Sequence, residues 1–121
     1  MYLYVLGGGR PHSGNKHSAL RTVGNSISVL DWALDAVENY VDDYYFVSGY
    51  ASETVCTAYP NLNYLHNGDW KDTCAGWSFL NALPNTPREI LVTYSDIVFR
   101  EAIVNDIINT DGDVVVAIDS R

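Results

Sequence analysis

Short apolar runs alternate with stretches of helical periodicity along the whole chain. The apolar runs predict five strands, over residues 1–6, 43–48, 62–65, 89–94 and 113–118. Helices are expected over residues 27–41, 51–59, 75–83 and 99–108, and Asn25 or Ser26 is expected to cap the first of them. This order predicts a Rossmann-like, three-layer α/β domain with a mainly parallel sheet and helices on both of its faces.

Length and charge narrow the classes of protein to consider. The 121 residues, of which 47% are hydrophobic, suffice for one domain with a real core, spanning residues 1–121. No apolar run approaches the roughly 20 residues that span a bilayer, so a cytoplasmic location is expected. The net charge of −8 argues against nucleic acid and against an anionic membrane as partners. Cys56 and Cys74 are expected to be free, mostly buried thiols.

The loop after the first strand has the chemistry of a phosphate site. Residues 1–30 carry Arg10, Lys16 and Arg21 and no acid, whereas all 15 acids lie from Asp31 onward. Gly7, Gly8 and Gly9 let the backbone pass close to a ligand and expose its N–H groups. Arg10 and Lys16 add positive charge, which suits a polyphosphate. The alternative is a flexible glycine turn after an edge strand.

An aspartate follows the most apolar strand directly. Asp96 comes after Tyr94 and Ser95, where the strand ends and ligands bind in parallel sheets. A Mg²⁺ ion bound to a nucleotide takes one or two carboxylates besides phosphate oxygens, so Asp96 is a candidate metal ligand. The alternative is a helix N-cap, because Ser and Asp both cap helices well.

Together these two features resemble the nucleotidyltransferases that attach sugar phosphates or phosphoalcohols to a nucleotide. The opening strand, glycine loop, lysine and first helix (residues 4–37) are similar to that family, as are residues 42–55 and 63–83. Residues 89–121, EILVTYSDIVFREAIVNDIINTDGDVVVAIDSR, resemble the branch that makes cytidylyl derivatives of phosphocholine or of phosphonates. The resemblance implies the nucleotide-diphospho-sugar transferase type of fold.

The resemblance also implies a reaction and a set of site residues. CMP, the favoured group, would pass from CTP to a small phosphorylated or phosphonate acceptor, and pyrophosphate would leave. Arg10 and Lys16 would neutralise phosphate charge and Asp96 would hold Mg²⁺. The residues implied in nucleotide binding are Leu6, Gly7, Gly8, Gly9, Arg10, Lys16, Thr73, Ala75 and Ser95.

The chain departs from the family pattern in its loop and in its length. Arg10 follows Gly9 directly, and Asn15 and Ser95 stand where proline and glycine are usual. Such enzymes are about twice as long, so the chain looks like a truncated, N-terminal half. We therefore expect a poor catalyst that binds nucleotide and self-associates through uncovered sheet edge. The alternative function is that of a non-catalytic nucleotide-binding or interaction fragment.

Overall fold

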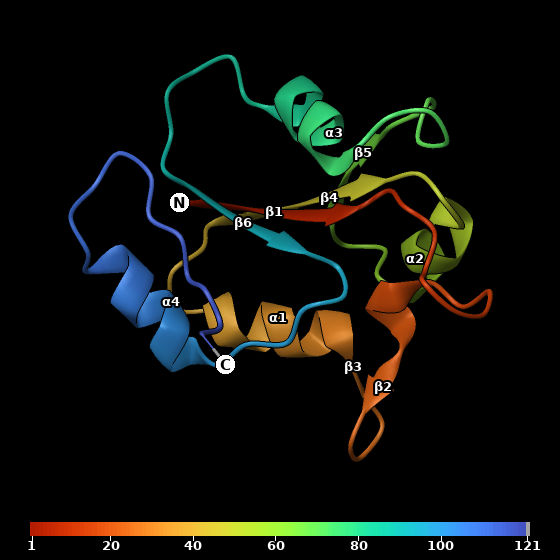
Figure 1. Ribbon diagram of the computed structural model, residues 1–121, viewed down its shortest axis with the longest axis horizontal. Helices are drawn as coiled ribbons and strands as arrows, with labels where there is room; N and C mark the ends of the chain where they lie inside the picture. The colour runs from red at the N-terminus through yellow and green to blue at the C-terminus, as the bar shows by residue number, and fades with distance from the viewer. Residues whose placement is uncertain (121) are drawn as a thin grey trace.

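The computed structural model describes residues 1–120 and shows a four-strand parallel sheet (Figure 1). Its strands are β1 (Tyr2–Gly7), β4 (Asp43–Ser48), β5 (Asn63–His66) and β6 (Ile90–Tyr94). They lie in the order β5-β4-β1-β6, and every neighbouring pair is parallel. Leu6 of β1 is in register with Val47 of β4 on one side and with Tyr94 of β6 on the other.

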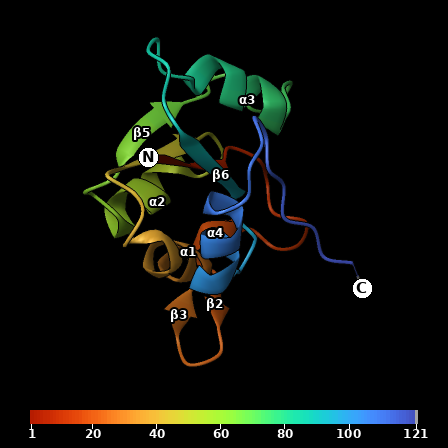
Figure 2. The ribbon, with the colours of Figure 1, turned by 90° about the vertical axis from the view of Figure 1, so that its left-hand side faces the viewer.

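Helices cover both faces of this sheet, which confirms the expected α/β class. In Figures 1 and 2, α3 (Ala75–Ala82) lies on one face, while α1 (Val29–Val37) and α4 (Glu101–Ile108) lie on the other. The short helix α2 (Ser52–Ala58) connects β4 to β5. The arrangement is compatible with a Rossmann-like fold.

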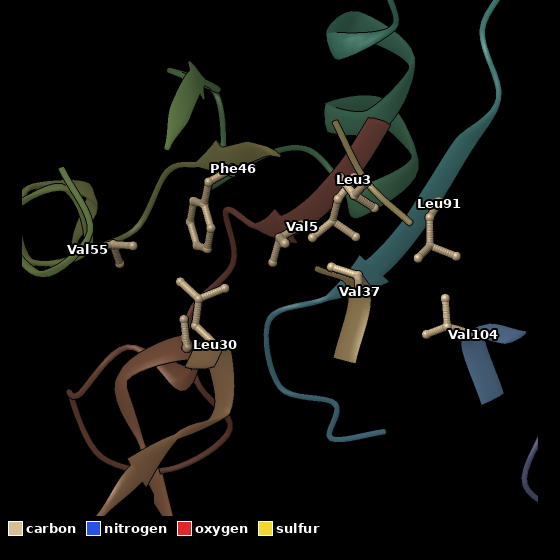
Figure 3. Close-up of a cluster of buried hydrophobic side chains, with 10 residues drawn as sticks. Leu3, Val5, Leu30, Val37, Phe46, Val55, Leu91 and Val104 are labelled. Atoms are coloured by element: carbon tan, nitrogen blue, oxygen red, sulfur yellow. The ribbon is translucent and has the colours of Figure 1, made fainter. Parts of the chain in front are cut away.

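The core has two parts because β1 is buried and its side chains alternate between the two faces. Leu3 and Val5 point toward α1 and α4, where they pack in a cluster with Phe46 and Leu91 (Figure 3). Val55 of α2 belongs to the same cluster. On the opposite face, Tyr4 and Leu6 form a smaller cluster with Val47 and with Ala82 of α3.

The prediction of a fifth strand over residues 113–118 is wrong. This segment has no regular secondary structure and pairs with none of the strands in the described chain. The side chains of Val114 and Ile118 are 84% and 83% exposed. The apolar run expresses only β propensity, which has little effect on structure without a neighbouring strand and a face to bury.

The predicted start of the first helix is also wrong. The helix α1 begins at Val29, because Ser28 is its N-cap: Ser28 Oγ accepts a hydrogen bond from Asp31 N (3.0 Å). The Asp31 carboxylate accepts in return from Ser28 N (3.2 Å), which completes a capping box. Asn25 and Ser26 lie instead between β2 (Thr22–Val23) and β3 (Ile27–Ser28), a small hairpin that projects away from the sheet (Figure 1).

The remaining regular element is a 3₁₀ turn, η1 (Ser18–Leu20), at the end of the glycine loop. Within residues 1–120, no helix combines the length and the apolar character that crossing a membrane requires.

Candidate functional site

A cavity of about 210 Å³ opens at the carboxyl ends of β1 and β6. The chain crosses from β1 to β4 on one side and returns to β6 on the other side of β1, so strand order reverses here. This is the position at which open parallel sheets bind ligands. The residues that line the cavity are Leu6, Gly8, Gly9, Arg10, Ser18, Trp70, Thr73, Cys74, Ala75, Ser78, Tyr94, Ser95 and Asp96.

The cavity brings together most of the residues singled out in the sequence. Three segments far apart in the chain meet there: the glycine loop, the segment before and at the start of α3, and the end of β6. The predicted site residues that line it are Leu6, Gly8, Gly9, Arg10, Thr73, Ala75, Ser95 and Asp96. Gly7 and Lys16 do not line it.

Gly7 has a packing role. A Cβ atom at this position would lie 2.2 Å from Cζ of Phe46, inside the larger core cluster. No side chain fits there unless the Phe46 ring moves. Glycine at position 7 therefore lets β1 lie against Phe46, whereas Gly8 and Gly9 line the cavity.

His17 closes the base of the glycine loop. Its ring is 1% exposed, and Nδ1 accepts a hydrogen bond from Ala19 N (3.1 Å). The other nitrogen, Nε2, therefore carries the proton and donates to the Gly7 carbonyl (2.7 Å). Burial lowers the pKa of His17 below its ordinary value, although the Gly7 hydrogen bond opposes this shift. A neutral imidazole thus joins the two ends of a loop whose exposed part carries Lys16.

Asp96 is held at the cavity by a buried neighbour. Ser95 N donates to the Leu6 carbonyl (3.1 Å), which continues the pairing of β1 with β6. Ser95 Oγ also shares a hydrogen bond with Ser18 Oγ (2.9 Å), which links this turn to the end of the glycine loop. The alternative interpretation of Asp96 as a helix cap is wrong, because α4 begins at Glu101 with Arg100 as its N-cap.

The start of α3 forms the opposite wall. Asn67 donates to both Thr73 Oγ1 and Ser78 Oγ (2.8 Å each), which ties the preceding loop to the helix. Cys74 is the N-cap residue of α3 and is exposed, contrary to the expectation of a mostly buried thiol. Hydrogen bonds from the backbone N–H groups of Trp77 and Gly76 lower the pKa of its thiol.

Sequence reasoning did not select Ser18, Cys74 or Ser78 as site residues, yet all three line the cavity. For Cys74 a signal existed: it immediately precedes the helix expected from residue 75, so it occupies the cap position. Ser18 and Ser78 gave no comparable signal, since Ser18 follows the glycine loop and Ser78 lies within α3, and folding brings both to the cavity.

The fold and the cavity define an α/β domain with a parallel sheet and an open cavity where the strand order reverses. A scan of protein-family models finds no match to this chain, and no curated protein matches it.

Proposed function

We propose that the cavity binds the phosphates of a nucleoside triphosphate, with CTP favoured, and that the chain is the nucleotide-binding part of a nucleotidyltransferase. One observation carries the proposal: Gly8, Gly9, Arg10 and Asp96 line one cavity at the place where the strand order reverses. Exposed backbone N–H groups and an arginine are suited to phosphate oxygens.

The carboxylate fits a magnesium ion that arrives with the nucleotide. Residues 1–120 contain no group of three metal-binding side chains, so a cage made of protein ligands alone is not formed by the described part of the chain. Among the described residues that line the cavity, Asp96 is the one with a carboxylate. A Mg²⁺ ion held mainly by phosphate oxygens and water needs one or two carboxylates, and it would neutralise phosphate charge and orient the reacting groups.

Each proposed site residue then has a definite role in holding the nucleotide. The N–H groups of Gly8 and Gly9 hold phosphate oxygens, Arg10 balances their charge, and Asp96 orients the magnesium-bound phosphates. Lys16 lies outside the cavity on the exposed part of the loop, where its flexible side chain can approach the outer phosphates. Transfer of CMP to a small phosphorylated or phosphonate acceptor follows from the resemblance, and it depends on positioning rather than on an acid or base.

The size of the cavity favours a second candidate, a chain that binds nucleotide without turnover. At about 210 Å³ the cavity is smaller than the roughly 300–1,000 Å³ of pockets that enclose a drug-sized ligand. It accommodates part of a nucleotide but not a nucleotide and an acceptor together. We therefore expect measurable binding and slow pyrophosphate release.

Calorimetry with CTP and Mg²⁺ tests binding. Arg10→Ala and Asp96→Asn are each expected to raise Kd about tenfold or more, because a charge-assisted contact contributes about 1.5–3 kcal/mol. Arg88→Ala and Asp43→Asn are matched controls, since Arg88 lies over the Tyr2 ring and Asp43 pairs with Tyr2, both at the opposite end of the sheet. Equal effects of site and control variants would contradict the proposal.

A second assay separates the two candidates. Pyrophosphate release is measured with CTP, Mg²⁺ and a panel of phosphocholine, phosphonates and sugar phosphates. Turnover that Asp96→Asn abolishes would identify the chain as an enzyme. Binding without release would favour the non-catalytic alternative.

A further inference from the structure

Arg10 sits on two aromatic rings supplied by two other segments of the chain. Its guanidinium carbon lies 5.6 Å from the centroid of the Tyr50 ring and 5.5 Å from that of Trp70. The two rings are 5.6 Å apart and nearly perpendicular, at 70°, so each offers a surface to the same cation. Arg10 and Trp70 both line the cavity, whereas Tyr50 is not among the lining residues.

Tyr50 is itself fixed at several points. Its hydroxyl donates to the Asn15 carbonyl (2.7 Å) and its backbone N–H donates to the Gly8 carbonyl (2.9 Å). Its ring also lies nearly parallel to buried His17, with centroids 6.4 Å apart. Tyr50 therefore contacts both ends of the glycine loop, at Gly8 and at Asn15 and His17.

Trp70 reaches this place because Gly49 leaves room for it. A Cβ atom at position 49 would lie 2.6 Å from both the Gly8 carbonyl oxygen and the Trp70 Cβ atom. The glycine loop, the end of β4 and the loop before α3 thus approach each other more closely than side chains would allow. This close approach places the Tyr50 and Trp70 rings beside the exposed side chain of Arg10. Exposed loop side chains are usually mobile, so the two rings restrict one that would otherwise move freely.

We propose that Tyr50 and Trp70 are positioning residues that hold the Arg10 guanidinium at the cavity for an incoming phosphate. The inference rests on the proposed function and adds to it the means by which a loop arginine is kept in place. A long side chain held before the ligand arrives loses less conformational freedom on binding, so the ordered arginine binds phosphate more tightly. Cation–π contacts at exposed sites are strong enough to bias a side chain in this way.

The free protein allows a test that needs no nucleotide. Aromatic ring currents should shift the Arg10 δ-methylene proton resonances upfield, and Trp70→Leu should return them toward the values of an unstructured arginine. Trp70→Phe keeps an aromatic face and should preserve much of the shift. Lys71→Ala is the matched control, since Lys71 Nζ lies 5.6 Å from the same Trp70 ring. Unshifted Arg10 resonances, or resonances that ignore Trp70→Leu, would overturn the inference.

A double-mutant cycle then tests whether the rings act through Arg10. With CTP and Mg²⁺, Trp70→Leu is expected to raise Kd about threefold to tenfold in the otherwise unchanged protein. In the Arg10→Ala background the same substitution should have little further effect. Tyr50→Phe keeps the ring but removes the Asn15 contact, so it should weaken binding less than Tyr50→Leu.

The outcomes separate this inference from the proposed function. If Trp70→Leu weakens CTP binding equally with and without Arg10, Trp70 acts directly on the ligand or on the fold, and the positioning role is refuted. A second outcome is that the unsubstituted protein does not bind CTP although its Arg10 resonances are shifted. The nucleotide-binding proposal then fails, and the role of the two rings in positioning Arg10 for phosphate fails with it. The contact of the rings with Arg10 would still stand.

Discussion

The two faces of the sheet are covered very differently. On the face of α1 and α4, ten buried residues from strands and helices form a continuous cluster (Figure 3). On the face of α3 the corresponding cluster has four buried residues, and Tyr94 at the end of β6 remains 50% exposed. The first face thus carries the larger buried cluster, and the second carries the smaller one and contributes the α3 wall of the cavity at the strand ends.

The largest expected effect is a difference in the unfolding free energy lost when a phenylalanine is replaced on each face of the sheet. Phe46→Ala removes a fully buried ring from the well-covered face and should cost about 3–5 kcal/mol of unfolding free energy. Phe79→Ala on α3, where the ring is half-buried against Tyr4, should cost about 1 kcal/mol. Urea denaturation measures both. Equal losses would mean that the two faces contribute equally to stability.

A smaller effect concerns pH. The folded-state pKa of His17 lies below its unfolded value, so the unfolded chain binds more protons as the pH falls below about 6.5. The contribution of His17 to stability is complete above that pH and is lost as the pH falls toward the folded pKa, by at most about 1.4 kcal/mol per pH unit. Urea unfolding at pH 7.5 and 5.5 measures it.

His17→Gln is the control for this pH dependence. The variant keeps a polar side chain but has no group that titrates in this range, and the other histidines are common to both proteins. The wild-type chain should therefore lose more stability on acidification than the variant. Parallel pH profiles would show that the imidazole is not held neutral at the base of the loop.

The rates at which the two cysteine thiols react provide another comparison of the two faces. Cys74 is exposed at the cavity and its thiol pKa is lowered by the backbone N–H groups of Trp77 and Gly76, whereas Cys56 is half-buried in α2. Iodoacetamide should modify Cys74 several times faster than Cys56, and CTP with Mg²⁺ should protect Cys74 alone. Peptide mass spectrometry follows each site. Faster modification of Cys56 would reverse the comparison.

The smallest effect is expected in the segment that follows α4. Val116→Thr should change the unfolding free energy by less than about 0.5 kcal/mol, because this valine is 70% exposed and unpaired. Val47→Thr in buried β4 is the matched substitution and should cost more than 1 kcal/mol. A comparable loss at both positions would indicate that residues 113–118 pair as a strand in solution.

Particular residues show what could be predicted from the sequence. The strand over 43–48 was predicted with its observed bounds, because acidic residues precede an apolar run and Gly49 ends it. Asp96 was placed correctly at the cavity, since whatever follows a parallel strand lies at the ligand edge. Both predictions use only local pattern and a general rule of sheet topology.

One failed prediction depends on contacts between distant segments, and the other depends on a local choice between possible helix caps. The run at 113–118 has the composition of a strand, but whether it pairs depends on a neighbour that composition does not specify. The α1 start depends on the capping box of Ser28 with Asp31, and Ser26, one of the two predicted caps beside Asn25, adopts a left-handed conformation with φ 71° in the hairpin turn. The contact of Arg10 with Tyr50 and Trp70 joins three segments, so no single stretch of sequence reveals it.

The hydrogen bond from His17 to Gly7 determines how the chain should tolerate insertions. It fixes the two ends of the glycine loop together, so the sheet does not depend on the length of the chain in between. Doubling the length of such a loop costs only about 0.6 kcal/mol of closure entropy. Insertions in the exposed part of this loop, away from Asn15 whose carbonyl accepts from Tyr50, are thus thermodynamically inexpensive. Such insertions should therefore leave the sheet and its cavity intact.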